Sequence, residues 1–341
     1  MDFTFTPEQV ELRRMLREVT ADKCTSAQVR AAMATPSGED TALCRLLVAE
    51  LGLVGVAAGE DAGGTGGSFV DAAVVIEESG RGLWPVPMLS SLVAVSSLAG
   101  HAPDLLQAVA GGQWRACVAV FEDVSLAGET LTGTARHVIG AGGAELVIAA
   151  TPEGLYAVQG ADVTTEAGLD PTRRLSTVVV EGSAAERLGD AAASARVVDL
   201  LRVGLAVEAV GVADWCLATT VGYLATREQF GRPIGSFQAL AHRAADLAVE
   251  LSAATSTAYY AAWVVDGAPD ELPVVAPLAK SVCTDAGYRI AAEAIQMHGG
   301  IGFTWEHDVH LYFKRATANR MLLGDGHAQR ELVADRAGLF S

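Results

Sequence analysis

The segment at residues 197–226 constrains the fold more than any other part of the chain, because it is apolar almost all the way round a helix. Charged side chains interrupt it only at Asp199, Arg202, Glu208 and Asp214. A helix with apolar residues on every side is expected to be buried among other helices. The residues that follow also repeat at helical spacing, so the sequence predicts a helical bundle in its C-terminal part.

The hydrophobic pattern changes twice along the chain and divides it into three parts. Residues 1–112 are predicted to be helical, with a helix that begins at Pro7 after Thr6 and others at about 40–51 and 69–79. Residues 113–188 hold short β-rich runs between turns, at 116–121, 146–150, 155–158 and 176–180. Residues 189–341 are helical again, with long helices predicted at 197–226, 236–265 and 273–298 and shorter ones through 336. The expected fold class is α+β, with an N-terminal α domain, a small antiparallel β domain and a C-terminal α domain like a four-helix bundle.

Charge and hydropathy argue against several classes of protein. The chain has 24 basic and 41 acidic side chains, so its formal net charge is 24 − 41 = −17, which disfavours nucleic acid as a partner. No uncharged apolar run reaches the roughly 20 residues that a membrane span needs. The segment at residues 1–8 lacks the basic and apolar regions of a secretory signal, and the five cysteines are far apart. We therefore expect a cytoplasmic protein with reduced thiols.

Glycine clusters and histidines do not complete a common nucleotide or metal motif. The clusters at 63–67, 140–143 and 299–302 match neither a dinucleotide-binding fingerprint nor a phosphate-binding loop. No histidine has a glutamate three residues before it, which excludes the di-iron motif of helical bundles. His307 and His310 could share a helix face, but they lack clustered carboxylates, so no metal is predicted.

Two segments of the C-terminal part carry residue types that suit a nucleotide. The first, at 223–238, contains Arg227, Phe230 and Gly231, and the second, at 296–304, contains Gln296 before a glycine cluster. A guanidinium binds a diphosphate with two parallel hydrogen bonds, and an aromatic ring offers its face to a base. Backbone N–H groups at Gly299, Gly300 and Gly302 can approach a phosphate closely.

At these residues the chain resembles the acyl-CoA dehydrogenase family, flavoenzymes that oxidise the Cα–Cβ bond of acyl-CoA thioesters. The pattern Arg-x-x-Phe-Gly-x-x-Ile-x-x-Phe-Gln begins at Arg227, and Gln-x-x-Gly-Gly-x-Gly-Phe begins at Gln296. The cluster at 63–67 and the helix to Glu78 also look like the family's N-terminal domain. The resemblance implies FAD as cofactor, an acyl-CoA substrate and an electron-transfer flavoprotein as acceptor. It also implies an oligomer, because in the family these two segments hold the ADP half of an FAD bound mainly by the neighbouring subunit.

The chain departs from the family at the catalytic base. The position of the usual glutamate is occupied by Leu323, and the alternative position on the first bundle helix aligns with about Leu201. Leucine cannot abstract an α-proton. The candidates for a displaced base are Asp325, which is two residues from the usual position, and Asp199, with His327 and Glu208 as further titratable neighbours.

The chain also departs from the family where the flavin ring would lie. His137 stands where the family has a tryptophan and Ile139 where it has a threonine, and the preceding loop is reduced to residues 121–123. The segments that reach a neighbour's flavin are retained. We therefore expect the short subunit of a heterotetramer, which completes FAD sites on a longer partner. A self-sufficient homo-oligomer with a displaced base and a flavin-free structural or binding protein are the alternatives.

Overall fold

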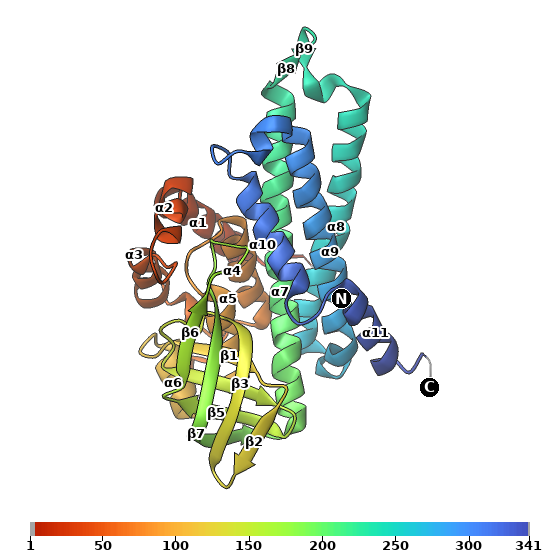
Figure 1. Ribbon diagram of the computed structural model, residues 1–341. Coiled ribbons are helices and arrows are strands. Elements are labelled where there is room, and N and C mark those ends of the chain that lie inside the picture. Colours follow the sequence, from red (N-terminus) through yellow and green to blue (C-terminus); the bar gives the residue numbers. More distant parts are fainter. Residues whose placement is uncertain (1–3, 340–341) are drawn as a thin grey trace.

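Helix α7 (Ala191–Thr226) runs along the length of the molecule and contacts all of its parts (Figure 1). The computed structural model describes residues 4–339, so residues 1–3 and 340–341 of the predicted domains and of the N-terminal segment lie outside the described residues. Asp190 caps α7 by accepting a hydrogen bond from Ala193 N at 3.0 Å. The helix starts a few residues before the predicted apolar segment. That segment is largely buried as far as Leu217, as expected, but most of residues 218–226 are partly or fully exposed, which corrects the prediction for its last two turns.

The N-terminal part is helical, as predicted. Helix α1 (Pro7–Lys23) begins with a capping box, in which Gln9 N donates to Thr6 Oγ1 at 3.3 Å and Thr6 N donates to Gln9 Oε1 at 3.1 Å. The helix predicted at 40–51 is α3 (Thr41–Arg45), and it continues as a π-helical turn. The remaining helices are α2 (Ser26–Met33), α4 (Phe69–Arg81), α5 (Met88–Leu98) and α6 (Pro103–Ala110).

The middle part is a sheet that is antiparallel at every pairing but one. Its strands are β1 (Ala116–Val120), β2 (Val124–Ala127), β3 (Thr130–Ile139), β4 (Leu146–Thr151), β5 (Gly154–Gln159), β6 (Asp162–Glu166) and β7 (Leu175–Gly189). The prediction of a purely antiparallel domain is corrected at one edge, where β1 pairs in parallel with β4. This arrangement is possible because the β2–β3 hairpin separates the two strands in sequence and returns the chain to the starting end of the sheet.

Strand β7 joins the two halves of the sheet. Its first half pairs with β3 and β6, and its second half pairs with β5. The two halves enclose a small apolar core of their own, which includes Phe121, Leu131, Val147, Val158 and Val178. The other core is continuous from the N-terminal helices into the bundle, so α4 and α5 pack directly on α7.

The C-terminal part is a helical bundle. Besides α7 it contains α8 (Gln238–Gly267), α9 (Leu272–His298), α10 (Val309–Met321) and α11 (Gly326–Arg336). A short hairpin of β8 (Glu228–Gln229) and β9 (Arg232–Pro233) connects α7 to α8 at the far end of the bundle (Figure 1). The predicted order of an α part, a sheet and an α part is confirmed. The domain limits at 112/113 and 188/189 stay a prediction.

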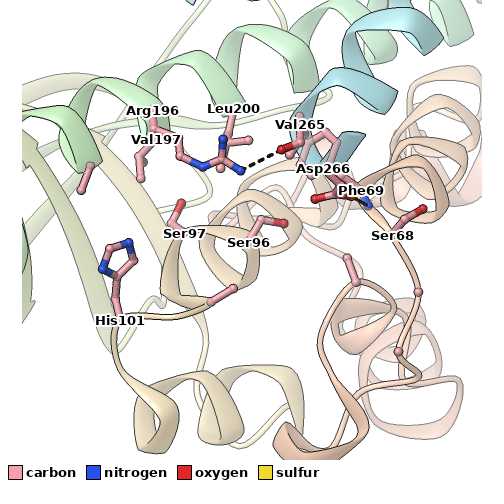
Figure 2. Close-up of a pocket in the computed structure, with 15 residues that line it drawn as sticks. Ser68, Phe69, Ser96, Ser97, His101, Arg196, Val197, Leu200, Val265 and Asp266 are labelled. Atoms are coloured by element: carbon pink, nitrogen blue, oxygen red, sulfur yellow. Dashed lines mark hydrogen bonds between the residues drawn. The ribbon is translucent and has the colours of Figure 1, made fainter. Parts of the chain in front are cut away.

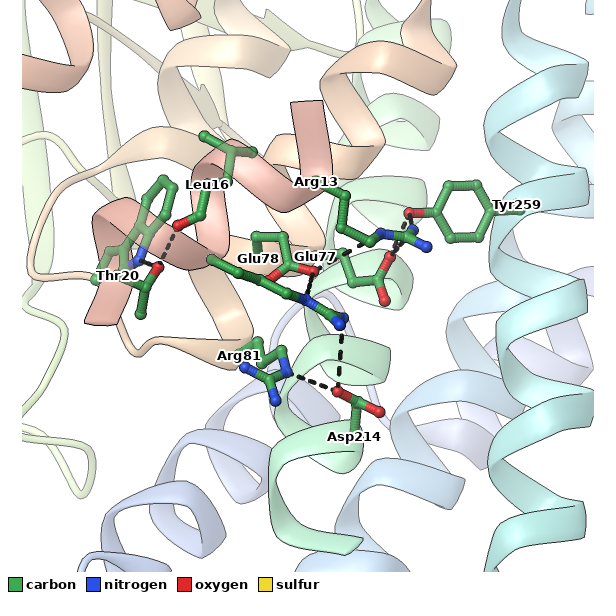
Figure 3. Close-up of polar contacts among 10 residues, drawn as sticks. Arg13, Leu16, Thr20, Glu77, Glu78, Arg81, Asp214 and Tyr259 are labelled. Carbon is green, nitrogen blue, oxygen red and sulfur yellow. Dashed lines mark hydrogen bonds and ion pairs between the residues drawn. The ribbon is translucent and has the colours of Figure 1, made fainter. Parts of the chain in front are cut away.

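Polar contacts fasten helix α1 to the rest of the helical core (Figure 3). Arg13 Nη2 donates to Glu77 Oε2 of α4 at 2.7 Å and to the Tyr259 hydroxyl of α8 at 2.8 Å. Arg17 pairs with Glu78, which is buried in α4. These contacts hold α1 against α4 of the N-terminal part and against α8 of the C-terminal bundle, so they connect the two helical parts. No helix within residues 4–339 is long and apolar enough to cross a membrane.

Candidate functional site

A cavity of about 1350 Å³ lies where the sheet meets the bundle. Strand β3, the segment 166–175 before and into β7, the first half of α7 and the end of α10 form its walls. The titratable side chains along it are Glu122, Asp123, Arg136, His137, Glu166, Asp170, Arg173 and Arg202. Apolar residues, among them Leu322 and Leu323, close the side formed by α10. The cavity thus joins the predicted flavin-ring strand to the predicted base position.

A bulge in β3 directs two side chains toward this cavity. The pairing with β7 shifts between Ala135 and Val138, so Arg136 and His137 form an irregularity in the ladder. His137 has a φ of 56°, a left-handed conformation that is uncommon for residues other than glycine. Bulges of this kind redirect side chains near functional sites. Both side chains are exposed to the cavity, whereas Ile139 is buried in the core.

Leu323 lies in a strained turn that borders the cavity. Its φ is 57°, and the following Gly324 has a φ of 90°. Gln329 Nε2 donates to the Leu323 carbonyl at 2.6 Å, and Lys280 Nζ donates to the Gly324 carbonyl at 2.6 Å. Non-glycine residues keep such a conformation only where surrounding contacts hold it, and they concentrate at functional sites. The turn therefore has a backbone of the kind found at functional sites, but the Leu323 side chain is apolar.

The buried Lys280, which donates to this turn, should make the stability of the folded chain depend on pH. Burial lowers the pKa of Lys280 from 10.5 to about 8. Between these values the unfolded chain holds a proton that the folded chain has released, so the free energy of unfolding should rise with pH by up to about 3 kcal/mol. We expect urea unfolding at pH 7 to 10 to show this rise as a difference between the native chain and Lys280→Met. A difference that stays constant with pH would contradict the expected linkage.

The two aspartates proposed as a displaced base are both occupied by other contacts. Asp325 is the N-cap of α11, and its carboxylate accepts from the backbone N–H groups of His327 and Ala328, which lower its pKa. Asp199 is buried, and its carboxylate accepts from Arg202 at 2.6 Å and from Arg336 at 2.9 Å. Neither residue lines the cavity. Their role as a base stays a prediction without geometric support.

Glu208 and Leu201 also lie away from the open cavity. Leu201 is 6% exposed within α7. Burial alone would raise the pKa of Glu208, but the guanidinium groups of Arg173 and Arg315 hold it low. Glu208 accepts from Arg173 at 2.7 Å and from Arg315 at 3.2 Å. A carboxylate held by two arginines is a weak proton acceptor, so Glu208 acts here as the centre of a buried ion network.

The two nucleotide-like segments come together at the far end of the bundle. The Tyr223 ring, from the first segment, stacks on the His298 ring of the second at a centroid distance of 4.6 Å. Arg227 follows the last residue of α7 and is exposed, and the Phe230 side chain is 93% exposed. Gln296 is also exposed, on the last turn of α9. The structure thus unites two segments that the sequence places about sixty residues apart.

The glycines of this end differ in their surroundings. Gly231 and Gly299 have positive φ values, and a Cβ at Gly299 or Gly300 would have no heavy atom within 4 Å among the described residues other than the glycine itself and its neighbours along the chain. Their backbone is therefore open to a ligand or to another chain. Gly302 is buried instead, and a Cβ there would lie 2.9 Å from the Ile295 carbonyl oxygen. Close packing therefore explains why residue 302 is a glycine. The predicted contact of Gly302 with a cofactor is supported by the sequence motif alone.

The bundle end and the cavity are separated along α7. Val198 lines the cavity and Arg227 follows the end of the helix, so at about 1.5 Å per residue they are about 40 Å apart. One ligand molecule in the cavity therefore cannot also contact the bundle end of the same chain. That end also has three exposed aromatic side chains, those of Phe230, Phe303 and Trp305. Exposed apolar surface of this kind indicates contact with another molecule.

The sequence pointed to His137 and residues 121–123 of the cavity lining and to Glu208, but not to the other charged lining residues or to the ion network around Glu208. Asp170, Arg173 and Arg315 come from separate elements, and only the charged run around residue 170 before β7 gives a local sign of them. His307 and His310 lie near Trp305 and His298. No group of three or more metal-ligating side chains that could hold an ion occurs in residues 4–339.

Comparisons with known proteins agree with the motifs. The family described as "Acyl-CoA dehydrogenase, C-terminal domain" matches residues 165–338, and "Acyl-CoA dehydrogenase, N-terminal domain" matches residues 6–105. The chain is 38% identical over 318 residues to acyl-CoA dehydrogenase IpdE2 of Mycobacterium tuberculosis, covering 92% of this chain and 93% of that protein.

Two solved structures of two-protein assemblies are similar along the whole chain. A chain of the Tcur3481-Tcur3483 steroid ACAD G363A variant superposes with a TM-score of 0.90 at 31% identity, over 98% of this chain and 99% of that one. A chain of the ChsE4-ChsE5 complex from Mycobacterium tuberculosis superposes with a TM-score of 0.92 at 27% identity, over 100% of both.

Proposed function

Because the chain belongs to the acyl-CoA dehydrogenase family of FAD-dependent enzymes, we propose that it is a subunit that completes the FAD site of a longer partner. The observation that carries the proposal is the exposed bundle end with Arg227, Phe230 and Gln296, which lies about 40 Å from the cavity of its own chain. The apolar Leu323 beside that cavity supports the same assignment.

The residues of the bundle end fit the adenosine diphosphate part of FAD. The Arg227 guanidinium can donate two hydrogen bonds to the diphosphate, and the free face of Phe230 can stack on adenine. The open backbone at Gly299 and Gly300 allows a phosphate to approach closely. The strand that would border the flavin ring fits less well, because its bulge presents Arg136 and His137.

The proposed reaction is the α,β-dehydrogenation of an acyl-CoA thioester, in which bound FAD supplies the hydride acceptor. Leu323 cannot take the α-proton in the cavity of this chain, so the base belongs to the partner subunit. The Tcur3481-Tcur3483 steroid ACAD and the ChsE4-ChsE5 complex support a heteromer, since each pairs two different proteins. The steroid acyl-CoA dehydrogenase among them favours a steroid-derived acyl group. We expect a cytoplasmic complex and an electron-transfer flavoprotein as the electron acceptor.

A self-sufficient homo-oligomer with a displaced base is the second candidate, and the carboxylates that line the cavity favour it. The carboxylates of Glu122, Asp123 and Glu166 line the cavity. The two aspartates predicted as a displaced base, Asp325 and Asp199, do not line it. The third possibility, a flavin-free structural protein, leaves the exposed Arg227 and Phe230 without a role.

Flavin content of the purified protein distinguishes these candidates. The chain is expressed alone and together with a longer acyl-CoA dehydrogenase subunit that has the usual glutamate. We expect the lone chain to carry little FAD and the complex to carry about one FAD for each pair of subunits. Visible absorbance after gel filtration measures this ratio. Equimolar FAD and turnover by the lone chain would support the homo-oligomer instead.

A further inference from the structure

A second cavity, of about 400 Å³, lies on the other side of α7 from the first (Figure 2). Arg196, Val197 and Leu200 line it, whereas Val198 and Arg202 line the larger cavity. With 3.6 residues per turn these two sets face different sides of the helix. The beginning of α4, the end of α5 and the end of α8 close the other walls. This space is therefore separate from the candidate flavin site.

Arg196, the arginine of this cavity, has no carboxylate partner among residues 4–339. Arg196 Nη2 donates to the Val265 carbonyl at 3.0 Å, and Arg196 forms no ion pair in the described part of the chain. Asp266 lines the same cavity, but its Oδ2 accepts from Phe69 N at 2.7 Å. Phe69 is the first residue of α4, where the helix dipole stabilises a negative charge. The Arg196 guanidinium therefore has N–H groups left to donate to an anion. It is a local positive charge in a chain whose net charge is −17.

The remaining walls provide further donors and an apolar surface. Ser96 and Ser97 donate to carbonyls of their own helix, at 3.0 and 2.6 Å, and their hydroxyls can rotate toward a ligand. Figure 2 shows Ser97 between Arg196 and the His101 ring, which can also donate, and Ser96 beside Arg196 on the side away from His101. Val197 and Leu200 form the apolar side. Convergent donors beside an apolar wall are typical of small-molecule sites.

We propose that this cavity binds a small monocarboxylate. Its carboxylate group meets Arg196 and the two serines, and its short hydrocarbon body lies against Val197 and Leu200. A monoanion is favoured over phosphate, because a second negative charge would face Asp266 within the same cavity. The site does not depend on the flavin arrangement, since it involves neither the bundle end nor the larger cavity.

Calorimetric titration of the purified protein with butyrate, butyramide and inorganic phosphate tests this site. We expect butyrate to bind the native protein at least about tenfold more tightly than butyramide, because only butyrate forms the charge-assisted hydrogen bond. Phosphate should bind more weakly than butyrate. Equal binding of butyrate and butyramide, no heat from butyrate, or tighter binding of phosphate would overturn the proposal.

Two variants assign the binding to Arg196. Arg196→Met should weaken butyrate binding at least about tenfold. The matched control is Arg187→Met, which removes an exposed arginine that likewise donates to a backbone carbonyl, and it should leave the Kd unchanged. An unchanged Kd in a folded Arg196→Met would reject the site. The comparison of butyrate with butyramide uses only the native protein, so it decides the question even if that variant fails to fold.

Discussion

Replacing Arg315 by methionine is expected to lower the free energy of unfolding by about 3–5 kcal/mol, because it leaves two buried carboxylates without their shared cation. Arg315 is 2% exposed and pairs with both Asp170 and Glu208. Its Nη2 also donates to Thr172 Oγ1 at 2.8 Å. These contacts tie α10 to α7 and to the segment before β7, so they also hold the wall of the larger cavity. Urea unfolding at neutral pH measures the loss.

The matched control for this substitution lies on the same helix. Arg320 pairs with Asp285 at 2.7 Å, but the two side chains are 37% and 31% exposed. Arg320→Met is therefore expected to cost no more than about 1 kcal/mol. The loss in Arg315→Met should also diminish in acid. The arginines hold the pKa values of Asp170 and Glu208 low against burial, so the stability from these pairs is present at neutral pH and disappears as the carboxylates are protonated. Equal losses in both variants would contradict the assigned burial of the network.

Substituting alanine for two glycines of α7 should change stability in opposite directions. At Gly211 a Cβ would lie 1.9 Å from the Glu77 carbonyl oxygen, because α7 and α4 cross there at close range. Gly211→Ala must push the two helices apart, and we expect a loss of roughly 2–4 kcal/mol. Gly222 is exposed, and apart from its chain neighbours and the backbone of its own helix no described heavy atom lies within 4 Å of its Cβ position. Gly222→Ala should gain about 0.5–1 kcal/mol from helix propensity.

Thermal and urea unfolding of the two alanine variants check this pair. Both substitutions add the same methyl group to the same helix, so only the surroundings differ. A gain in stability for Gly211→Ala would show that the close crossing of α7 and α4 is wrong.

The helices were predictable because their signals are local. The cap at Thr6 and the apolar run of α7 each lie within one element, and the structure has both. The parallel pairing of β1 with β4 depends on where the chain returns after the β2–β3 hairpin, which no strand pattern encodes. The π-helical turn after α3 also lacks a sequence pattern that distinguishes it from an α-helix.

The candidate site was predictable only where its residues form motifs. Arg227 and Gln296 each belong to a compact pattern, and the structure brings the two patterns together through Tyr223 and His298. By contrast, Asp170 and Arg315 are 145 residues apart, and nothing near either residue identifies its partner. Buried ion pairs of this kind become visible only in the folded chain.

The FAD affinity of the two-subunit complex with Arg227→Met in this chain tests the central claim most directly. Arg227 is exposed, so its replacement should leave folding and assembly intact. If the bundle end holds the diphosphate of a flavin on the partner, the Kd for FAD should rise at least about tenfold. Arg187→Met, at an exposed arginine of the sheet, should leave that Kd unchanged. An intact Arg227→Met complex that binds FAD as tightly as the native one would contradict the shared site.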